Sequence, residues 1–480
     1  MERYDIVVVG AGTAGMPCAI EAVATGARVL VVEAQDQVGG TLHVSLGQLS
    51  GAGSALQAER GISDSAKAHM ADIERINRGT GRRDILELTL PRQGATIDWL
   101  MENGFDMDPV CPTILHLHEA YREARTYWGV EGGISVLKVL TPLFDAAMAK
   151  PNATLMLSTK ATGLKTDGGR VAGVTVEGPG CTREIATDIV VLATGGYGSN
   201  AQLFARLTGG QALYTAAMPG SDGSGIEIAE QAGAALRGQD LFLPTYAGIP
   251  EKGDGNRVIW RHMPSLTPQV RQPWELHLTT EGRRFVREDD PSVDNREHAL
   301  AAEPDMSFWC VFDDAIQDKA PALLPGWTAA ELAAAWNARP DFVTAPDLAT
   351  LADRTEMKSD ALAESLAAYN DACTGASADP MGRTHLPQAI AGPGFRAIRM
   401  RGMVLKTPAG LDVDQTLTVR RTDGTPITGL HAVGEAIGGS TLSGRGFISG
   451  MSVTPALTLG RWLGRTLGQS PGARKTESAA

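Results

Sequence analysis

Residues 4–15 read YDIVVVGAGTAG and decide the fold of this 480-residue chain. The apolar, β-branched run from Ile6 to Val9 is typical of a strand buried within a parallel sheet. It leads directly into the G-x-G-x-x-G turn of residues 10–15, and a helix is predicted from Met16 to about residue 25. Residues 27–33, ARVLVVE, predict a second buried strand. Together these segments predict a βαβ unit.

This βαβ unit predicts a dinucleotide-binding site. Glycine allows the backbone to approach a pyrophosphate closely, and the amino terminus of the following helix stabilises the pyrophosphate charge. Glu33 ends the second strand at the spacing expected for an acidic side chain that binds a ribose hydroxyl, and its charge disfavours the extra phosphate of NADP. The residues that we expect to contact the dinucleotide here are Gly10, Gly12, Ala14, Gly15, Glu33 and Ala34.

Two later patterns extend this domain. Residues 188–194 form another apolar strand pattern, which ends in a pair of glycines. Residues 154–176 alternate between apolar and polar side chains around the turn DGGR at 167–170, which is typical of a hairpin. The sequence therefore predicts an α/β domain that carries a β-ribbon.

A second domain is predicted within the first. From about residue 239 prolines and tryptophans become more frequent, and alanine-rich helices are predicted at 329–336 and 359–373. Strand and turn patterns return from Met403, and a last helix is predicted from about Pro455. We therefore expect an α/β fold in which a discontinuous Rossmann-like domain, residues 1–239 and 401–480, holds an inserted α+β capping domain, residues 240–400.

Composition excludes several classes of protein. A formal net charge of -12 without a long basic run argues against nucleic-acid binding. No apolar run reaches roughly 18 residues, and the first strand begins close to Met1, so neither membrane insertion nor a signal peptide is expected. The five cysteines are scattered and never form a Cys-x-x-Cys pair, so we expect no disulfide framework, no metal site and a cytoplasmic location.

Five further motifs occur in a familiar order: GGT at 39–41, ATGGY at 193–197, SDGSG at 221–225, EGRRF at 281–285 and GE at 434–435. With the amino-terminal turn, they make nearly the whole chain resemble the succinate dehydrogenase/fumarate reductase flavoprotein superfamily, including its soluble fumarate reductase and 3-ketosteroid dehydrogenase branches. The resemblance implies FAD as the cofactor and a Rossmann-like FAD-binding domain beneath the cap. The further residues that it implies for FAD binding are Gly39, Gly40, Thr41, Ala161, Ala193, Thr194, Gly195, Asp222, Gly434, Glu435, Ser452 and Val453.

Two details of the FAD site follow from the resemblance. Thr454-Pro455 is typical of a helix N-cap followed by proline, and the resemblance implies that this helix start faces the flavin, where its positive end would stabilise the reduced ring. An ordinary capped surface helix is the alternative. His43 follows the Gly-Gly element at the place where membrane-bound relatives attach FAD covalently, so a covalent link is a second hypothesis.

The resemblance also implies catalytic groups between the cap and the FAD-binding domain. Arg296 is the candidate proton shuttle, with Asp294 or Glu297 as a relay, although a surface ion pair is an equal alternative. Thr267 is a candidate substrate contact, and Arg445 can bind a carboxylate or enolate oxygen.

Two kinds of side chain remain open between a functional and a structural role. Tyr246 can polarise a ketone, but buried tyrosines more often serve packing. His116 and His118 have a metal-like spacing without further ligands nearby, so they are expected to cap a structure or to line a pocket.

The chain departs from the family pattern on the substrate side. Leu243 stands where a histidine is expected, no histidine occurs in LKTPAG at 405–410, and Ser292 stands where some relatives have a functional arginine or tyrosine. These departures disfavour a dicarboxylate and favour a ketone or monocarboxylate.

We therefore expect an FAD-dependent oxidoreductase that interconverts saturated and α,β-unsaturated carbonyl compounds, more often as a dehydrogenase. Its partners would be a small carbonyl or carboxylate substrate and an electron acceptor that the sequence does not identify. The alternatives are an amino-acid or amine oxidase of the aspartate-oxidase type and a flavoprotein electron-transfer subunit of a membrane complex.

Overall fold

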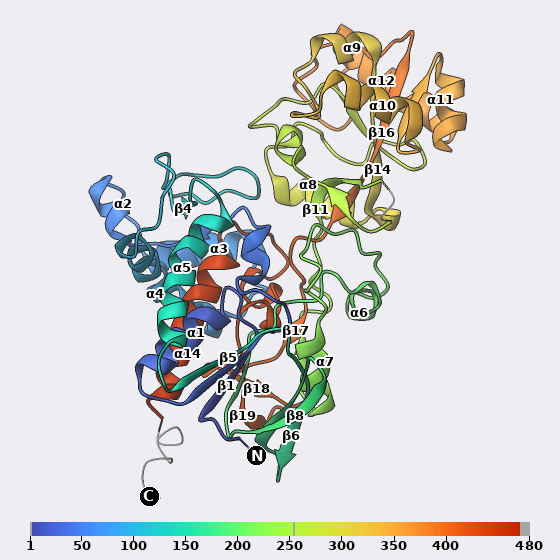
Figure 1. The fold of residues 1–480 in the computed structure, drawn as a ribbon. Helices are drawn as coiled ribbons and strands as arrows, with labels where there is room; N and C mark the ends of the chain where they lie inside the picture. The colour runs from blue at the N-terminus through green and yellow to red at the C-terminus, as the bar shows by residue number, and fades with distance from the viewer. Residues whose placement is uncertain (1, 253–254, 471–480) are drawn as a thin grey trace, which may run out of the picture.

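The computed structural model describes residues 2–252 and 255–470 and has two lobes (Figure 1). The larger lobe contains the amino-terminal strand and the last helix of the chain, and the smaller lobe lies at one end of it. Each lobe has its own hydrophobic core. This arrangement confirms the predicted α/β fold with a cap inserted into a discontinuous FAD-binding domain.

The larger lobe is built on a sheet with the strand order β5-β2-β1-β9-β19-β7-β6, in which β18 also pairs with β19 and β8 with β7. Strands β5, β2, β1, β9 and β19 run parallel to one another. The strands are β1 (Ile6–Val9), β2 (Val29–Val32), β5 (Ala153–Met156), β6 (Lys160–Asp167), β7 (Arg170–Gly178), β8 (Cys181–Ala186), β9 (Val190–Leu192), β18 (Thr418–Arg420) and β19 (Pro426–Ala432).

The sequence patterns predicted this sheet correctly in its essentials. Strands β1 and β2 are parallel, with Ile6 opposite Val29 and Val9 opposite Val32, as a βαβ unit requires. The hairpin of β6 and β7 turns at Gly168 and Gly169, which have φ values of 54° and 81° that suit glycine. The predicted β-ribbon therefore exists and is extended by β8.

Helix α1 (Gly15–Ala24) packs closely against helix α14 (Val453–Gly468). Glycines at every fourth position of α14 allow this approach, because a Cβ at Gly460 would meet the carbonyl of Ala14 and one at Gly464 would meet the carbonyl of Cys18. The contact holds the start of α14 next to the glycine-rich turn after β1.

Further helices surround the larger sheet. They are α2 (Ala55–Glu59), α3 (Ala66–Asn77), α4 (Arg83–Glu102), α5 (Gly133–Met148), α6 (Ala201–Leu207), α7 (Ser224–Gln231) and α13 (Ser440–Ser443), with short 3-10 helices η1 (Gly40–His43) and η4 (Gly434–Ile437). Two small two-stranded sheets join β3 (Leu49–Ser50) to β4 (Thr126–Tyr127) and β10 (Leu236–Arg237) to β17 (Gly410–Leu411).

The smaller lobe, called the cap below, has an antiparallel sheet with the order β12-β11-β16-β14-β13, in which β15 also pairs with β16. Its strands are β11 (Thr245–Pro250), β12 (Val258–Ile259), β13 (Leu276–Thr279), β14 (Ser307–Asp313), β15 (Phe342–Ala345) and β16 (Phe395–Met403). Its helices are η2 (Met263–Leu266), α8 (Val293–Ala301), η3 (Pro304–Met306), α9 (Asp314–Lys319), α10 (Ala329–Ala338), α11 (Leu348–Thr355) and α12 (Ser359–Thr374). Helices α10 and α12 confirm the two alanine-rich helices expected from the sequence.

The limit that we placed at 400/401 falls inside β16, which belongs to the sheet of the cap along its whole length. The domain limits of 1–239 with 401–480 and 240–400 therefore stay a prediction.

Within residues 2–252 and 255–470, no helix combines the length and the apolar character needed to cross a bilayer. All five cysteines are unpaired.

Candidate active site

The carboxyl ends of four parallel strands meet at one edge of the larger sheet. Gly10 follows β1, Glu33 follows β2 and Ala193 follows β9, and Gly434 comes shortly after β19. In open α/β sheets ligands bind outside this edge. The motifs that the sequence spreads over more than 400 residues are thus brought together by strand order alone.

Glycine is required at position 10 for two reasons. Its φ of 99° disfavours other residues, and a Cβ there would lie 2.5 Å from the carbonyl oxygen of Ala193. Gly15 also has a packing role, because a Cβ there would meet the carbonyl of Gly10; its contact with the cofactor stays a prediction. It allows α1 to start tightly against the turn and does not itself line the pocket described below.

Glu33 is held rigidly at the end of β2. Its carboxylate accepts hydrogen bonds from the backbone N–H of Ala11, at 2.7 Å, and of Gln35, at 2.9 Å. The side chain is 9% exposed, and this exposed part faces the pocket. A carboxylate fixed in this way can accept further hydrogen bonds from ribose hydroxyls.

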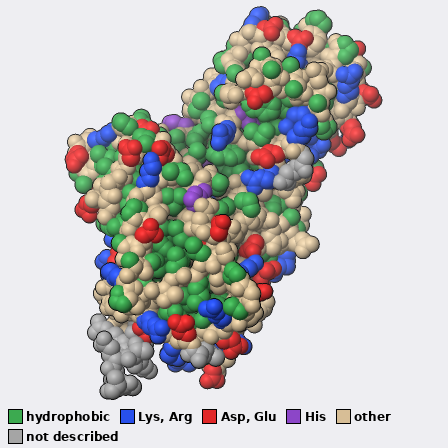
Figure 2. Space-filling view, viewed as in Figure 1, with side chains coloured by type: hydrophobic (Ala, Val, Ile, Leu, Met, Phe, Trp, Pro, Cys, Tyr) green, Lys and Arg blue, Asp and Glu red, His purple; other side chains and the backbone are tan. Residues whose placement is uncertain are grey.

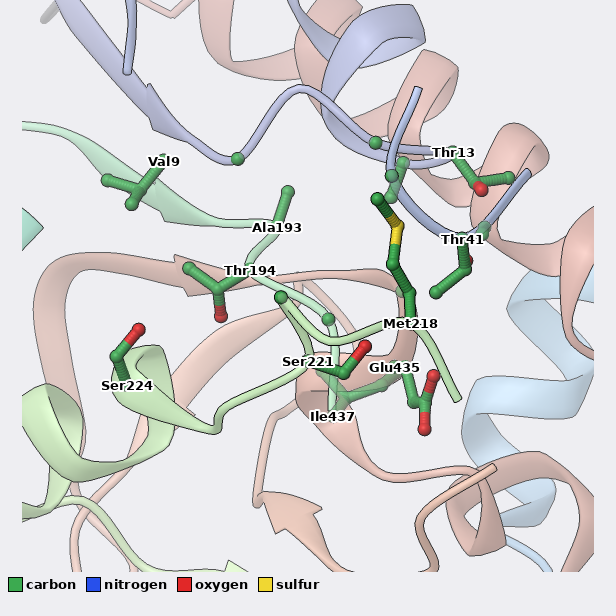
Figure 3. Close-up of a pocket in the computed structure, with 18 of the residues that line it drawn as sticks. Val9, Thr13, Thr41, Ala193, Thr194, Met218, Ser221, Ser224, Glu435 and Ile437 are labelled. Carbon is green, nitrogen blue, oxygen red and sulfur yellow. The ribbon is translucent and has the colours of Figure 1, made fainter. Parts of the chain in front are cut away.

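A long pocket, called the first pocket below, runs along this edge and holds about 1460 Å³ of space, its open mouth included. Figure 3 shows the side chains of Thr41 and Glu435, from separate segments, converging on one part of it with Met218 and Ser221, which share a loop. The predicted residues that line it are Gly10, Gly12, Ala14, Glu33, Ala34, Gly40, Thr41, Ala161, Ala193, Thr194, Gly195, Asp222, Gly434, Glu435, Ser452 and Val453.

Gly39 is not among these lining residues. It has a φ of 110° and donates its N–H to the carbonyl of Ala11 at 2.8 Å, so it positions η1 beside the glycine-rich turn. Sequence reasoning missed other lining residues, among them Thr13, Gln35, Lys160, Met218, Ser221, Lys406, Leu442 and Met451. Thr13 and Ser221 lie within the motifs at 10–15 and 221–225 but at positions that were not singled out, and the others lie outside the quoted motifs.

The residues of the first pocket fit FAD. The Cα atoms of Gly12 and Gly40 border the pocket where a Cβ on Gly40 would lie 3.3 Å from Gly12, so this part of the wall is bare backbone suited to a pyrophosphate. Thr194 Oγ1 is buried without a hydrogen-bond partner among the described residues. A ligand hydroxyl or amide would satisfy it.

The start of α14 differs from the sequence prediction. Val453 is the first helical residue, Ser452 precedes it without a side-chain cap, and Thr454 lies inside the first turn. The hydroxyl of Thr454 instead accepts a hydrogen bond from the backbone N–H of Ser50 at 2.8 Å. The predicted Thr454 cap is therefore wrong because β3 competes for the same hydroxyl, but the helix still begins at the pocket wall.

A second pocket adjoins the first. The seven residues common to both are Thr41, Met218, Ser221, Lys406, Glu435, Ser452 and Val453. Apolar side chains from both lobes line much of the remainder, namely Val44, Leu46, Leu117, Trp260, Met263, Leu405, Phe447 and Ile448. Figure 2 shows hydrophobic side chains gathered in the hollow where the two lobes meet.

Lys406 is the only lysine or arginine among the described residues that line the second pocket. Its ammonium group donates a hydrogen bond to Ser443 Oγ at 2.7 Å and lies over the ring of Phe447. Burial lowers the pKa of Lys406 to about 8, against the opposing effect of Glu435 and Glu297. The sequence analysis singled out residues 405–410 only because they contain no histidine, and it did not predict a role for Lys406.

Glu435 faces the same space. Its carboxylate accepts hydrogen bonds from the backbone N–H and the hydroxyl of Thr407, at 2.7 and 2.8 Å. Burial raises the pKa of Glu435, whereas these hydrogen bonds and Lys406 lower it. Its place in both pockets suits a group that contacts the cofactor near the substrate.

His118 also lines the second pocket and is only 3% exposed, in agreement with one of its two expected roles. Its ring stacks on Phe447 with the ring centres 3.7 Å apart. Its Nδ1 lies 3.6 Å from Glu297 Oε1, so helix α8 of the cap approaches the larger lobe at this point.

The four predicted catalytic residues line neither pocket. Arg296 donates to the carbonyl of Leu266 at 2.5 Å and lies 5.4 Å from the ring centre of Tyr246. The hydroxyl of Tyr246 pairs with His277 Nδ1 at 2.9 Å, and burial raises its pKa well above the usual value. Thr267 directly follows Leu266 and is buried. These three residues thus meet inside the cap.

Arg445 lies apart from them in the larger lobe. Its backbone N–H donates to Thr80 Oγ1 at 2.9 Å; the residue is half-buried, and its Nε is buried without a hydrogen-bond partner among the described residues. Its catalytic role, like those of Arg296, Thr267 and Tyr246, stays a prediction.

Among the described residues no ion pair joins Arg296 to Asp294 or Glu297, so the expected relay stays a prediction. Asp294 pairs with Arg78 at 3.0 Å and with His298 at 3.3 Å, and Glu297 faces His118. Ser292 caps α8 and donates its hydroxyl to Glu119 at 2.9 Å. These carboxylates are turned toward the larger lobe, which no local sequence pattern indicates.

His43 lies outside both pockets. Its exposed ring is hydrogen bonded through Nε2 to the carbonyl of Val38 at 2.9 Å. This position gives no support to a covalent link with FAD.

One cluster of metal-ligand types occurs among the described residues, formed by Glu275, His277 and Cys310 in the core of the cap. Both oxygens of Glu275 are bound by Arg271 at 2.9 Å. Because the guanidinium already occupies the carboxylate, this cluster is an ion pair within a packed core rather than a metal site.

A family model described as an FAD binding domain matches residues 5–446. The chain belongs to this family of FAD-binding proteins. The match confirms FAD as the cofactor, and with the relatives below it confirms the succinate dehydrogenase/fumarate reductase superfamily.

This FAD-binding chain is 27% identical over 466 residues to a fumarate reductase (cytochrome) of Shewanella frigidimarina, covering 96% of the chain and 76% of the relative. It is also 27% identical to a vinyl phenol reductase of Lactiplantibacillus plantarum, covering 92% and 91%. Its fold is similar to a 3-ketosteroid delta1-dehydrogenase of Sterolibacterium denitrificans, with a TM-score of 0.74 at 19% identity, covering 98% and 100%.

Proposed function

We propose that this flavoprotein interconverts saturated and α,β-unsaturated carbonyl or carboxylate compounds, with the substrate bound in the second pocket. The observation that carries the proposal is the continuity of the two pockets, which share seven wall residues. A dinucleotide stretched along the first pocket would bring one end against the second. Bound FAD would accept a hydride from the substrate or return one to it.

Lys406 is the proposed anchor for the substrate oxygen. It is a single cation beside Phe447 in a largely apolar wall, and the other lining groups able to ionise are His118 and Glu435. One cation suits a ketone oxygen or one carboxylate, whereas a dicarboxylate would place its second charge against apolar side chains. This supports the preference for a ketone or monocarboxylate.

For the cofactor we propose that the sixteen predicted residues lining the first pocket contact FAD, and that Gly15 and Gly39 support the turn and η1 behind it. The start of α14 would lie against the cofactor, where the positive end of the helix favours negative charge. We propose the cytoplasm as the location of the protein, because all five cysteines are unpaired.

The test is an anaerobic panel read from the visible absorbance of the bound flavin. Reduced, FAD-loaded protein is mixed with cyclohexenone, cinnamate or fumarate, and oxidised protein with cyclohexanone, phenylpropanoate, succinate or aspartate. We expect spectral change with members of the ketone or monocarboxylate pairs. Change with aspartate alone would support the oxidase alternative, and a protein inert to the whole panel would overturn the proposal.

A further inference from the structure

Two buried polar atoms face each other where the lobes meet, and neither has a hydrogen-bond partner within the described part of the chain. They are Nδ1 of His118, from the larger lobe, and Oε1 of Glu297, from helix α8 of the cap. They lie 3.6 Å apart, and both side chains are almost fully buried. A buried polar atom without a partner calls for an explanation, and here a ring nitrogen and a carboxylate oxygen from the two lobes lie opposite each other.

We propose that His118 exchanges a proton with the substrate carbon next to the carbonyl group, and that Glu297 is a positioning residue that holds the imidazole through Nδ1. This inference rests on the proposed function, because it places the substrate in the second pocket. It adds the acid–base group that the reaction requires.

The geometry of the ring supports this role. Phe447 stacks on one face of the imidazole with ring centres 3.7 Å apart, which fixes its plane. Because Nδ1 is enclosed, Nε2 is the nitrogen left to face the pocket that His118 lines. A carboxylate on one ring nitrogen orients the ring and stabilises its protonated form, while the other nitrogen handles the proton.

The other candidates are engaged elsewhere. Among the described residues that line the second pocket, only His118, Lys406 and Glu435 have an acidic or basic side chain. Glu435 accepts hydrogen bonds from Thr407, and the ammonium group of Lys406 is assigned above to the substrate oxygen. Arg296 and Tyr246 are buried in the cap with partners of their own.

The protons and electrons of the reaction balance between the substrate, His118 and the flavin. In dehydrogenation Nε2 takes the proton from the α-carbon as the two carbons form a double bond, and bound FAD would be the acceptor for the hydride of the β-carbon. Reduction is the reverse: hydride is added to the β-carbon and Nε2 gives its proton to the α-carbon. When His118 holds the proton, its imidazolium faces the carboxylate of Glu297. The other charged groups near His118 are Glu119, the next residue in the chain, and Lys406, which lies over the same Phe447 ring.

Because Glu297 belongs to the cap, the pair also links acid–base chemistry to the position of the cap. At 3.6 Å the contact is slightly longer than a hydrogen bond, and a small approach of α8 would complete it. Catalytic hydrogen bonds are often long before substrate binds.

The first test uses proton NMR of the oxidised, FAD-loaded protein with cinnamate bound, and it needs no turnover. An Nδ1 proton hydrogen bonded to a carboxylate resonates far downfield of the amide region. We expect one such signal that disappears in Glu297→Gln and in His118→Gln and persists in Glu119→Gln. The last variant is the matched control, because Glu119 adjoins His118 but binds Ser292. Absence of the signal in the unmodified protein, or its loss in all variants, would overturn the pair.

The second test follows the flavin with the panel compound that reacts. We expect His118→Gln to slow the reaction by roughly 100-fold or more with unchanged FAD content and ligand affinity, as for loss of a general acid or base. Glu297→Gln should slow it less and change its pH profile, which a merely structural residue would not do. Unchanged kinetics in His118→Gln would overturn the acid–base role while leaving the proposed function intact. If no panel compound reacts, the proposed function and the acid–base role both fail, and the NMR result still decides the pair.

Discussion

The ammonium nitrogen of Lys406 lies 4.3 Å from the centre of the Phe447 ring, and His118 stacks on the same ring. Phe447 therefore holds a cation and an imidazole next to each other in the wall of one apolar pocket. A cation over an aromatic face is stabilised without a carboxylate partner, so the charge of Lys406 stays available for a ligand.

Replacement of Lys406 tests its role as an anchor. We expect Lys406→Met to weaken binding of cinnamate to the oxidised, FAD-loaded protein by roughly 10- to 100-fold, because a hydrogen bond to a charged group contributes about 1.5–3 kcal/mol. Calorimetric titration measures this affinity. Lys138→Met is the control, since Lys138 is exposed and pairs with Glu131. Equal affinities in all three proteins would remove Lys406 from the substrate site.

The pH dependence of cinnamate binding follows from the same lysine. Burial lowers the pKa of Lys406 to about 8, so the group is charged below that pH and neutral above it. Cinnamate stays anionic throughout this range, and its affinity should therefore fall as the pH rises through about 8. A profile that is flat from pH 7 to pH 9, as read from titrations at each pH, would contradict the assignment.

Two glycine substitutions separate a steric clash from backbone strain. Gly10 and Gly26 both have positive φ, at 99° and 93°, but a Cβ meets Ala193 at Gly10 and nothing within 4 Å at Gly26. We expect Gly10→Ala to lose bound FAD and Gly26→Ala to keep it with a loss of stability of about 1 kcal/mol. Flavin absorbance per protein and thermal unfolding measure the two effects. Full FAD occupancy in Gly10→Ala would show that the turn tolerates a side chain.

The ion pair of Arg271 and Glu275 predicts acid sensitivity of the cap. Burial alone would raise the pKa of Glu275, but Arg271 lowers it to about 2. A lowered carboxyl pKa stabilises the fold fully above about pH 4.5, and this contribution is lost as the pH falls toward 2. Urea unfolding followed by tryptophan fluorescence should show the decline below about pH 4.5, and constant stability down to the folded pKa would contradict it.

Breaking the pair should cost more than removing it. Arg271→Met leaves a buried carboxylate without its cation, and we expect a loss of about 3–5 kcal/mol in the free energy of unfolding. The double variant Arg271→Met with Glu275→Leu should recover most of that loss, because both charges are gone. An equal loss in single and double variants would mean that packing, not charge, sets the stability at this place.

FAD should be released by acid. His43 is exposed and bound to Val38 outside both pockets, so no bond to the flavin is expected. Acid precipitation should leave all the yellow colour in the supernatant, in the unmodified protein and in His43→Ala alike. Colour that stays with the pellet only when His43 is present would establish the covalent link.

Local patterns predicted the cofactor side of this protein far better than the substrate side. The βαβ unit, the glycine turn and Glu33 follow from neighbouring residues, because a buried parallel strand and a tight turn each leave a short-range signature. Thr454 shows the limit of such reasoning. Its place before a proline is typical of a helix cap, but its hydroxyl accepts a hydrogen bond from the backbone N–H of Ser50 in β3 instead.

The substrate pocket draws on residues that no local pattern joins. His118, Lys406 and Phe447 come from separate segments, and Glu297 reaches them from the cap. Arg296 has the residue type and the spacing expected of a proton shuttle. In the structure it lies inside the cap and does not line the second pocket.

The amino-acid sequence was enough to predict the nucleotide-binding half of the protein and an inserted lobe, because strand, turn and helix periods are short-range properties of a chain. Its FAD family followed from a resemblance carried by short motifs. Only the tertiary structure decided which side chains face the substrate. That choice depends on how two separately packed cores meet, and residues as far apart as His118 and Lys406 become neighbours only through that meeting.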